Sequence, residues 1–478
     1  MKLSWSSLRF GASLATHAAC GLTALLALNL GGAHAAEVVW DGHYRTSGFY
    51  FDSLSLISEA DSAFSEGSAG WLDHRLRLQP GFLMSDKVAI YTQVDLLPYV
   101  RYGEDPVDVV DPISGTTSPY VYSDAVGAPL TEEGGVTSQN LRVTRAWGEV
   151  QTRYGQLRFG RMPVEWGTGM VFNAGNDVED DFGDTSDRIQ FTGKVKKKVY
   201  VMGAFENRYE GLLAEPDDYR ALVTAVYYKG ERSGAGTYHT LRRRSLTDDA
   251  GAESTYYNWI GDVWAGTNLG PLKADLELAG SIGNGDLEDG INDLKSSSFG
   301  GVLAADYAPG RLAGVNVLLT AGFATGDAID DGEQHTFAFD PDYDLGIMLF
   351  EEPMPSFEPE VTNDANQGRT NEAARSGNTV SNALFLKVGG GYQFLPSLRG
   401  EVTALMATQA KATDTTGKGY GTELDATVKW APYAHFDLKA TGALFLPGKY
   451  FTEFESDEYG TGFDGPAVGS KLTAAIRF

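Results

Sequence analysis

The chain has 478 residues, a formal net charge of −26 and a single cysteine, Cys20. Such an acidic chain is a poor candidate for binding nucleic acid or for lying on an anionic lipid surface. With no second cysteine, a small disulfide-stapled secreted fold is excluded. The 58 glycines and 12% aromatic residues are typical of a chain with many short strands and turns.

Residues 1–35 have the layout of a secretory signal peptide. Lys2 and Arg9 form a basic start, an apolar stretch covers residues 18–30, and small residues precede an expected cleavage point after Ala35. The stretch is too short for a membrane helix, and no later segment has the roughly 18 consecutive apolar residues that one needs. We therefore expect a signal peptide over 1–35 and an exported domain over 36–478, without thiols or a membrane helix.

Apolar residues recur at every second position in many segments of the exported domain. In "LKADLELAGSI" (residues 272–282), Leu276 and Leu278 fall on one face, and Asp275 and Glu277 on the other. Segments of roughly ten residues with two such faces fit strands that cross a bilayer at a tilt, with lipid on one side and water on the other.

The connections between these segments differ in length. Short connections are expected at residues 85–87, 153–156, 195–198, 229–234, 269–271, 308–313, 395–397 and 431–434. Longer ones are expected at residues 52–70, 99–140, 166–187, 283–296, 326–381 and 447–466. Short turns at one end and long loops at the other are typical of an outer-membrane barrel whose turns face the periplasm.

These patterns predict an all-β fold: a transmembrane antiparallel β-barrel of about 18 strands in the bacterial cell outer membrane. The sheet must close on itself because an unpaired backbone N–H or C=O in hydrocarbon costs several kcal/mol. The strands of a soluble β-sandwich or propeller also alternate between apolar and polar residues, so such a fold is the competing interpretation.

The final residues, "KLTAAIRF" (471–478), alternate in the same way and put Phe478 on the apolar face. In this the chain resembles bacterial outer-membrane proteins, whose terminal aromatic residue is read by the barrel-assembly machinery. The resemblance implies that Phe478 is an assembly signal and that this machinery is a partner.

Assigning the apolar face of each strand to lipid leaves a mixed, slightly cationic set of residues for the lumen. The basic members are Arg75, Arg77, Arg145, Arg188, Arg220, Arg242, Arg244, Lys273, Lys387, Arg399, Lys429, Lys439, Lys471 and Arg477. The acidic members are Asp73, Asp95, Glu149, Asp262, Asp275, Glu277, Asp306, Glu401, Glu423, Asp425 and Asp437. Opposite charges can simply pair across strands, or the arginines can form a track that attracts an anionic or hydroxyl-rich solute.

The negative charge is concentrated in the loops, for example "NDVEDDFGD" (176–184). Such clusters offer oxygen ligands for calcium, but none has the twelve-residue spacing of a helix-loop-helix site, and weak divalent bridging to lipopolysaccharide is another interpretation. The five histidines of the exported domain are widely spaced, and no nucleophile or His-Glu-x-x-His motif accompanies them. We predict no metal, no cofactor, no catalytic residues and no enzymatic activity.

The stretch "LRVTRAWGEVQTRYGQLRFGRMPVEWGTGMV" (141–171) resembles the alginate-export-type porins. An Arg-Ala-Trp start leads through a short turn to "LRFGR" and then "PVEWGTG". The resemblance implies a monomeric, arginine-lined, eighteen-stranded channel for a secreted polysaccharide, with a periplasmic partner. By matching position, Arg145, Glu149, Arg158 and Arg161 would be lumen or constriction residues.

The sequence thus predicts an outer-membrane channel that exports a polysaccharide or oligosaccharide. The predicted path residues are Arg75, Arg77, Arg145, Glu149, Arg158, Arg161, Arg188, Arg220, Arg242, Arg244, Arg399 and Glu401. Expected partners are outer-membrane lipid and lipopolysaccharide, the assembly machinery and periplasmic polysaccharide-export components. The alternatives are a passive porin for small hydrophilic or anionic solutes and a plugged structural or surface-interaction barrel. Residues 99–140 and 326–381 are either extracellular lids or inward constrictions.

Overall fold

The structure is a computed structural model. It describes residues 37–52, 57–58, 68–101, 141–181, 183–209, 219–247, 253–286, 294–310, 312–327, 333–351, 379–412, 417–453, 455–456, 460–462 and 465–478. The predicted signal peptide, residues 99–140 beyond Arg101, and residues 352–378 lie outside this part of the chain. Among the described residues, no helix is long and apolar enough to cross a membrane.

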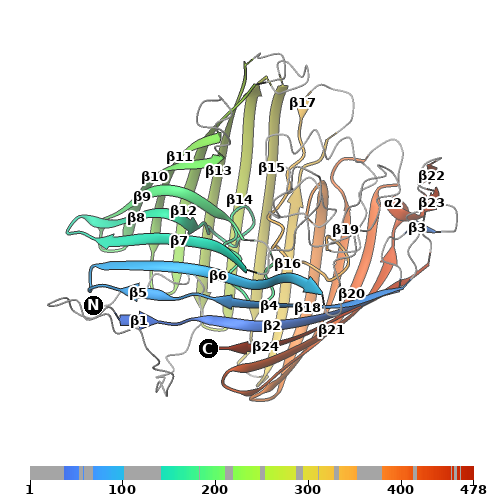
Figure 1. The fold of residues 1–478 in the computed structure, drawn as a ribbon. Coiled ribbons are helices and arrows are strands. Elements are labelled where there is room, and N and C mark those ends of the chain that lie inside the picture. The colour runs from blue at the N-terminus through green and yellow to red at the C-terminus, as the bar shows by residue number, and fades with distance from the viewer. Residues whose placement is uncertain are drawn as a thin grey trace. The chain divides into compact units, whose positions relative to one another are not determined.

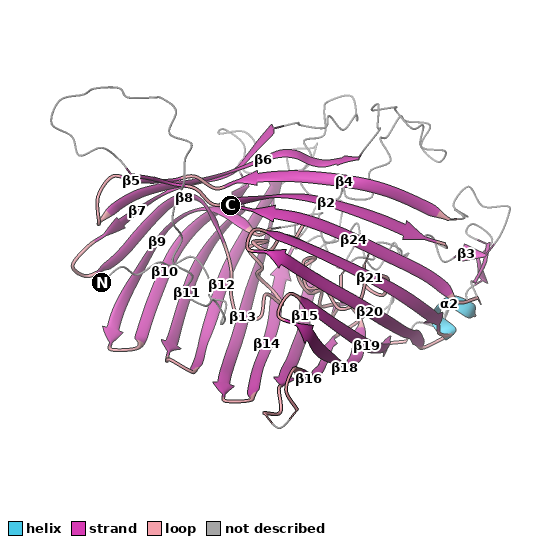
Figure 2. Cartoon of the chain, turned by 90° about the horizontal axis from the view of Figure 1, so that it is seen from below, coloured by secondary structure: helices cyan, strands magenta, loops and turns pink. Residues whose placement is uncertain are grey.

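Eighteen antiparallel strands of the described chain form one closed sheet (Figures 1 and 2). They are β2 (Gly42–Phe51), β4 (Ala69–Leu78), β6 (Val88–Arg101), β7 (Leu141–Gln151), β8 (Gly155–Pro163), β9 (Thr185–Lys196), β10 (Val199–Tyr209), β11 (Tyr219–Lys229), β12 (Ser233–Thr247), β13 (Glu253–Leu269), β14 (Leu272–Gly285), β15 (Leu294–Tyr307), β16 (Val315–Ala324), β18 (Ala383–Leu395), β19 (Leu398–Gln409), β20 (Gly419–Tyr433), β21 (Phe436–Pro447) and β24 (Ala467–Arg477). Each strand pairs with the next in this order, and β24 pairs with β2 to close the ring. The predicted fold class is confirmed.

Six short strands and one short helix complete the described structure. Strands β1 (Glu37–Val39) and β5 (Gly81–Leu83) pair beside β6, and β17 (Glu333–Gln334) lies parallel to β15. A small second sheet contains β3 (Ile57–Ser58), β22 (Glu455–Ser456) and β23 (Gly460–Gly462). A single short helix of the described residues, α2 (Lys449–Thr452), follows β21.

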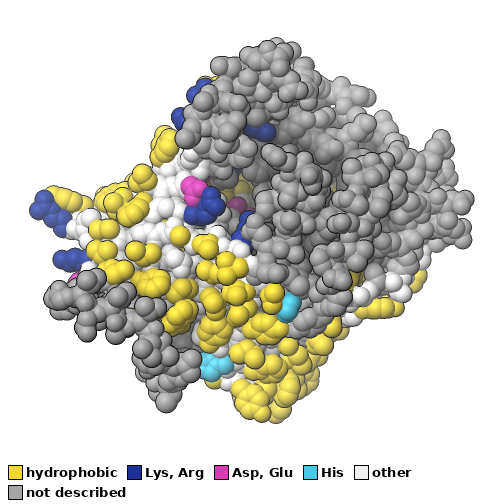
Figure 3. Space-filling model, in the orientation of Figure 1, with side chains coloured by type: hydrophobic (Ala, Val, Ile, Leu, Met, Phe, Trp, Pro, Cys, Tyr) yellow, Lys and Arg dark blue, Asp and Glu magenta, His cyan; other side chains and the backbone are white. Residues whose placement is uncertain are grey.

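The barrel wall is apolar outside and polar inside. On β14, the outward Leu276, Leu278 and Ile282 are 41%, 45% and 48% exposed, whereas the inward Glu277 is fully buried. A soluble protein would bury the leucines, so this inversion is explained by hydrocarbon around the barrel. Figure 3 shows apolar side chains spread over much of the outer surface that is in view.

The last strand carries its apolar residues outwards as predicted. Leu472, Ile476 and Phe478 are 50%, 50% and 47% exposed. The backbones of Phe478 and Gly42 exchange two N–H···O hydrogen bonds of 3.1 Å, so the final residue belongs to the closing seam between β24 and β2. Its role in assembly stays a prediction.

Candidate functional site

Two connections between strands fold back against the inner wall, and they define the candidate site. The first inner segment, residues 164–184, joins β8 to β9, and the second inner segment, residues 335–351, lies between β16 and β18. Both start at the end of the barrel where the long connections lie. Their contacts with inward-facing residues of strands far apart in the sequence place them inside the barrel.

The first inner segment packs an apolar face on strands β10 to β13. Val164, Trp166 and Phe172 join a buried cluster that includes Met202, Ala204, Val223, Ala225, Tyr238 and Trp264. The Trp166 indole donates to Asp262 (2.9 Å), and the Thr168 hydroxyl donates to Glu277 (2.6 Å). These contacts fasten the start of the segment to β13 and β14.

Four arginines of β2, β4 and β7 hold the rest of this segment. Arg45 donates to the Val178 carbonyl oxygen (3.2 Å) and forms an ion pair with Asp181 (2.6 Å), and Arg75 donates to the Val178 carbonyl oxygen (3.1 Å). Arg77 makes a bidentate ion pair with Asp95 (2.8 and 3.0 Å).

Arg77 and Arg145 also donate hydrogen bonds to the first inner segment. Arg77 donates to the Gly175 carbonyl oxygen (2.5 Å), and Arg145 donates to the Ala174 carbonyl oxygen and to Asn176 Oδ1 (2.8 Å). Arg45, Arg75, Arg77 and Arg145, here called the arginine clamp, are all nearly fully buried. Arg75, Arg77 and Arg145 therefore face inwards as predicted, but they bind protein oxygens there.

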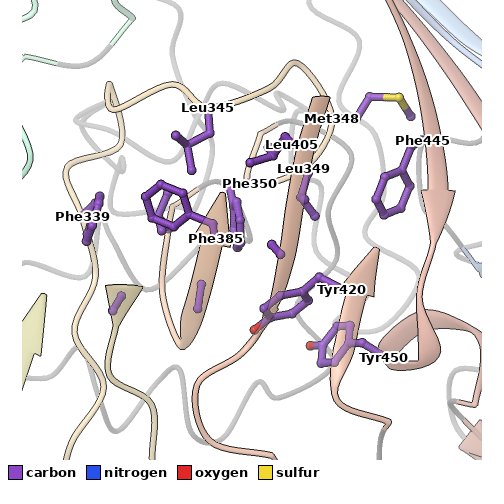
Figure 4. Packing of buried hydrophobic residues seen from close by; sticks show 14 of the residues in the cluster. Phe339, Leu345, Met348, Leu349, Phe350, Phe385, Leu405, Tyr420, Phe445 and Tyr450 are labelled. Atoms are coloured by element: carbon purple, nitrogen blue, oxygen red, sulfur yellow. The ribbon is translucent and has the colours of Figure 1, made fainter. Parts of the chain in front are cut away.

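The second inner segment packs on β18 to β21 (Figure 4). Phe339, Leu345, Met348, Leu349 and Phe350 belong to the same buried cluster as Phe385, Leu405, Tyr420 and Phe445 of the wall. The carboxylate of Glu423 on β20 accepts hydrogen bonds from three consecutive backbone N–H groups, those of Ile347 (2.8 Å), Met348 (3.0 Å) and Leu349 (2.6 Å). A buried glutamate therefore anchors each segment, Glu277 the first and Glu423 the second.

The two inner segments contact each other. The backbone N–H of Asp340 donates to the Met170 carbonyl oxygen (2.7 Å), and that of Asp181 donates to Asp342 Oδ1 (2.9 Å). Burial, together with the charges of Asp184 and Asp342, raises the pKa of Asp340 well above its ordinary value. The contacts join the segments into one partition across the lumen.

Asp181 has the opposite electrostatic environment. Burial alone would raise its pKa, but the charges of Arg45 and Arg75 outweigh this and lower the pKa to about 2. Asp181 thus stays ionised at neutral pH and binds the arginine clamp.

Most other predicted path residues also face inwards and are paired. Arg158 forms an ion pair with Glu149 (2.9 Å), and Arg188 forms one with Glu206 (3.0 Å). Arg242 lies over the Phe172 ring of the first inner segment, 5.8 Å from its centroid. Arg244 shares its inward face, and Arg399 contacts Glu401 (3.3 Å).

Arg161 and Arg220 do not face the lumen, and their prediction as path residues was wrong. Arg161 lies two residues after the exposed Phe159 and therefore on the same outer face of β8. It forms a bidentate ion pair with Asp187 on that face (2.9 and 2.6 Å). Arg220 shares the outer face of β11 with Leu222, which is 55% exposed. Its cross-strand partner is Arg243 on the same outer face.

Sequence reasoning missed Arg45 and Asp181. On β2, Arg45 lies on the same inward face as His43 and Ser47. The period-two pattern could therefore have placed it in the lumen. Asp181 belongs to the acidic stretch 176–184, which was interpreted as a solvated or calcium-binding loop. Within the described residues, no group of His, Cys, Asp and Glu suited to a metal ion occurs.

Three basic residues form a row on the inner wall near the short-turn end. Arg399 pairs with Lys429, and Lys429 with Lys439, as direct cross-strand neighbours on β19, β20 and β21. Lys429 is exposed, and Lys439 forms an ion pair with Glu179 of the first inner segment. Burial would raise the pKa of Glu179, but the charges of Lys439 and Lys471 outweigh it and lower that pKa. This basic row therefore already binds one carboxylate.

The solved structures that the chain matches include outer-membrane porins. The chain matches Pseudomonas aeruginosa OccK9 (OpdG) with a TM-score of 0.55 and 11% identity, covering 92% of this chain and 99% of that one. It matches Acinetobacter baumannii OccAB1 with a TM-score of 0.53, 13% identity and coverage of 92% and 96%. It matches a BenF-like porin from Pseudomonas fluorescens Pf-5 with a TM-score of 0.52 and 12% identity, covering 92% of this chain and 98% of that one. No protein-family model and no curated protein sequence matches the chain.

These matches show the fold and correct the predicted resemblance. The structural neighbours are Occ-type and BenF-like porins, whereas the sequence stretch 141–171 had suggested alginate-export-type porins, and that assignment was wrong. The chain is an eighteen-stranded β-barrel with the porin fold, located in the bacterial outer membrane.

Proposed function

We propose that the protein is a passive porin for small, negatively charged hydrophilic solutes. The observation that carries this proposal is that the two inner segments narrow the lumen and that a row of basic residues lies on its wall. Structural likeness to porins such as OccK9 and OccAB1 supports a channel, though at 11% and 13% identity it extends to the fold alone.

The size of the solute follows from the inner segments. Residues 164–184 and 335–351 contact each other and opposite parts of the wall, so they occupy lumen cross-section that a polysaccharide chain would need. This arrangement favours a small solute over an exported polymer.

The charge of the solute follows from the basic row. Lys429 stands directly opposite both Arg399 and Lys439, and like charges in such positions are destabilising unless an anion lies beside them. Glu179 shows how a carboxylate is received there. A mobile carboxylate or phosphate would bind the neighbouring Lys429 ammonium and Arg399 guanidinium in the same way.

The test measures ion selectivity in planar bilayers. We expect the purified barrel to conduct and to prefer chloride over potassium in a salt gradient. Replacing Arg399, Lys429 and Lys439 by Gln should lower the anion-to-cation permeability ratio at least about threefold, or roughly 0.7 kcal/mol of interaction with the pore.

The matched control removes three cations outside the lumen, through Lys196→Gln, Lys197→Gln and Lys198→Gln at the β9–β10 turn. It should keep the selectivity of the native barrel. Unchanged selectivity in the row variant would remove these residues from the path, and a barrel without conductance would favour the plugged alternative. The absence of enzymatic activity stays a prediction.

A further inference from the structure

An apolar groove of about 630 Å³ lies on the outer face of the barrel wall. It crosses β14, β15, β16, β18 and β19, which are neighbours in the ring (Figure 2). Pockets of roughly 300–1,000 Å³ hold small molecules in other proteins, so the groove is large enough for a ligand. Its outward side chains include one row of cross-strand partners: Leu278, Gly301, Phe323, Leu384 and Thr408.

The groove runs obliquely across the apolar band of the outer surface. Leu278 lies in the middle of β14, whereas Thr408 is the next-to-last residue of β19, at the end of the barrel opposite the short turns. Strands of outer-membrane barrels are tilted, so a row of cross-strand partners changes its depth in the membrane from one strand to the next. Because the short turns face the periplasm, the Thr408 end lies towards the outer leaflet. The groove therefore leads from the middle of the apolar band towards the lipid head groups of that leaflet.

Two lysines, Lys411 and Lys418, are exposed at the Thr408 end of the groove. The Thr408 hydroxyl donates to the carbonyl oxygen of Lys418 (2.8 Å). The backbone N–H of Lys411 donates to Asn382 Oδ1 (2.8 Å), and Asn382 lies two residues before Leu384 of the groove. These bonds hold the backbone of both lysines beside the groove, and a lysine side chain is long enough to extend its ammonium group to lipid head groups. The groove thus has an apolar course and a cationic end.

We propose that the groove binds an acyl chain of lipid A, the lipid part of lipopolysaccharide, and that Lys411 and Lys418 bind its phosphates. Lipid A joins phosphorylated sugars to acyl chains, so its anionic and apolar parts match the two ends of the groove. This match favours a lipid over a second copy of the chain, which would cover the leucines without explaining the cations. Glu453, whose carboxylate lies beside Gly417, forms an ion pair with Lys449 (2.8 Å) and does not by itself neutralise the two lysines. The proposal concerns the outer surface and does not depend on the solute of the channel.

The experiment titrates the whole purified barrel in detergent with lipid and measures binding by native mass spectrometry. The probes are bisphosphorylated lipid A, dephosphorylated lipid A and phosphatidylethanolamine, and we expect the first to bind about tenfold more tightly than either of the others. Lys411→Gln with Lys418→Gln should weaken binding of bisphosphorylated lipid A about tenfold and leave dephosphorylated lipid A unaffected. Ala321→Phe places a ring in the groove and should weaken binding of both forms of lipid A.

Two matched controls should bind lipid like the native barrel. Ala404→Phe adds the same ring on the outer face of β19 outside the groove, and Lys196→Gln with Lys197→Gln removes two exposed cations at the short-turn end. If Ala321→Phe fails to assemble, the lysine variant still tests the proposal, because its changes lie outside the strands. Native-like binding of bisphosphorylated lipid A by the lysine variant, or equal binding of phosphatidylethanolamine by the native barrel, would overturn the assignment. Native-like lipid binding by Ala321→Phe, with loss of an oligomer that the native barrel forms, would assign the groove to a second copy instead.

Discussion

Single charged residues inside the barrel serve mainly to position backbone. Arg77 uses three donors, two on Asp95 and one on the Gly175 carbonyl oxygen, and Arg45 uses Asp181 and two carbonyl groups in the same way. A guanidinium group has five donors and no acceptor, so burying it requires several oxygens, which the turns of the first inner segment supply. The arginine clamp is thus explained by the segment that covers it.

The ion pair between Asp181 and Arg45 gives a prediction at this scale. Because the pKa of Asp181 is lowered, the pair stabilises the first inner segment above the ordinary pKa of 3.8, and this contribution is lost as the pH falls towards 2. Asp181→Asn should remove about 1.5–3 kcal/mol of local stability at pH 7. Single-channel recordings of the variant at pH 7 should show frequent current fluctuations, which we expect of the native protein only at acidic pH.

Asp187→Asn is the control, since Asp187 pairs with Arg161 on the outer face and leaves the segment untouched. Recordings of Asp181→Asn as quiet as those of native protein at pH 7 would contradict the role of this pair.

At the scale of elements, each inner segment has an apolar face on the wall and one glutamate that accepts its backbone N–H groups. Glu423 accepts three consecutive N–H groups and Glu277 accepts the N–H of Thr168, so these backbone donors of the two irregular segments are satisfied without a helix. Gly346 lies against the Glu423 carboxylate, with no room for a Cβ atom. These anchors decide where the segments lie.

Removing the anchor of the second inner segment should widen the channel. Glu423→Ala leaves three buried N–H groups without an acceptor, at a cost of about 1–3 kcal/mol each. Gly346→Ala should displace the same segment by steric conflict. We expect higher single-channel conductance in both variants, and faster cleavage by chymotrypsin at the aromatic residues of 335–351.

Thr427→Ala is the control, because Thr427 lies on the same inner wall and its side chain bonds to Thr441. If conductance and cleavage in the Glu423 and Gly346 variants match those of the control, the segment does not narrow the channel.

At the scale of the whole molecule, the inverted distribution of polarity determines the stability of the barrel in lipid. Leu276→Arg places a charge on the outer face of β14 and should cost about 2–4 kcal/mol near the bilayer midplane. Urea unfolding of the barrel from liposomes measures this loss. Leu276→Met should change stability little, and an arginine variant as stable as native protein would argue against hydrocarbon at this face.

The period-two pattern failed where both faces of a strand are apolar. On β11, Ala221, Val223 and Ala225 face inwards although they are apolar, because Trp166 and Phe172 of the first inner segment cover that part of the wall. With no polar face to mark the lumen, Arg220 was assigned to the wrong side. Arg161 was assigned to the lumen through a motif resemblance, although it shares a face of β8 with Phe159, and that face is the outer one.

The sequence by itself determined the strands, their two faces and the need for closure, since alternation is local and backbone groups in hydrocarbon must pair. Only the tertiary structure decided which long connections turn inwards and which charges they cover. That choice depends on contacts between residues far apart in the chain, such as Arg45 with Asp181 and Glu423 with residues 347–349. No local pattern encodes such contacts.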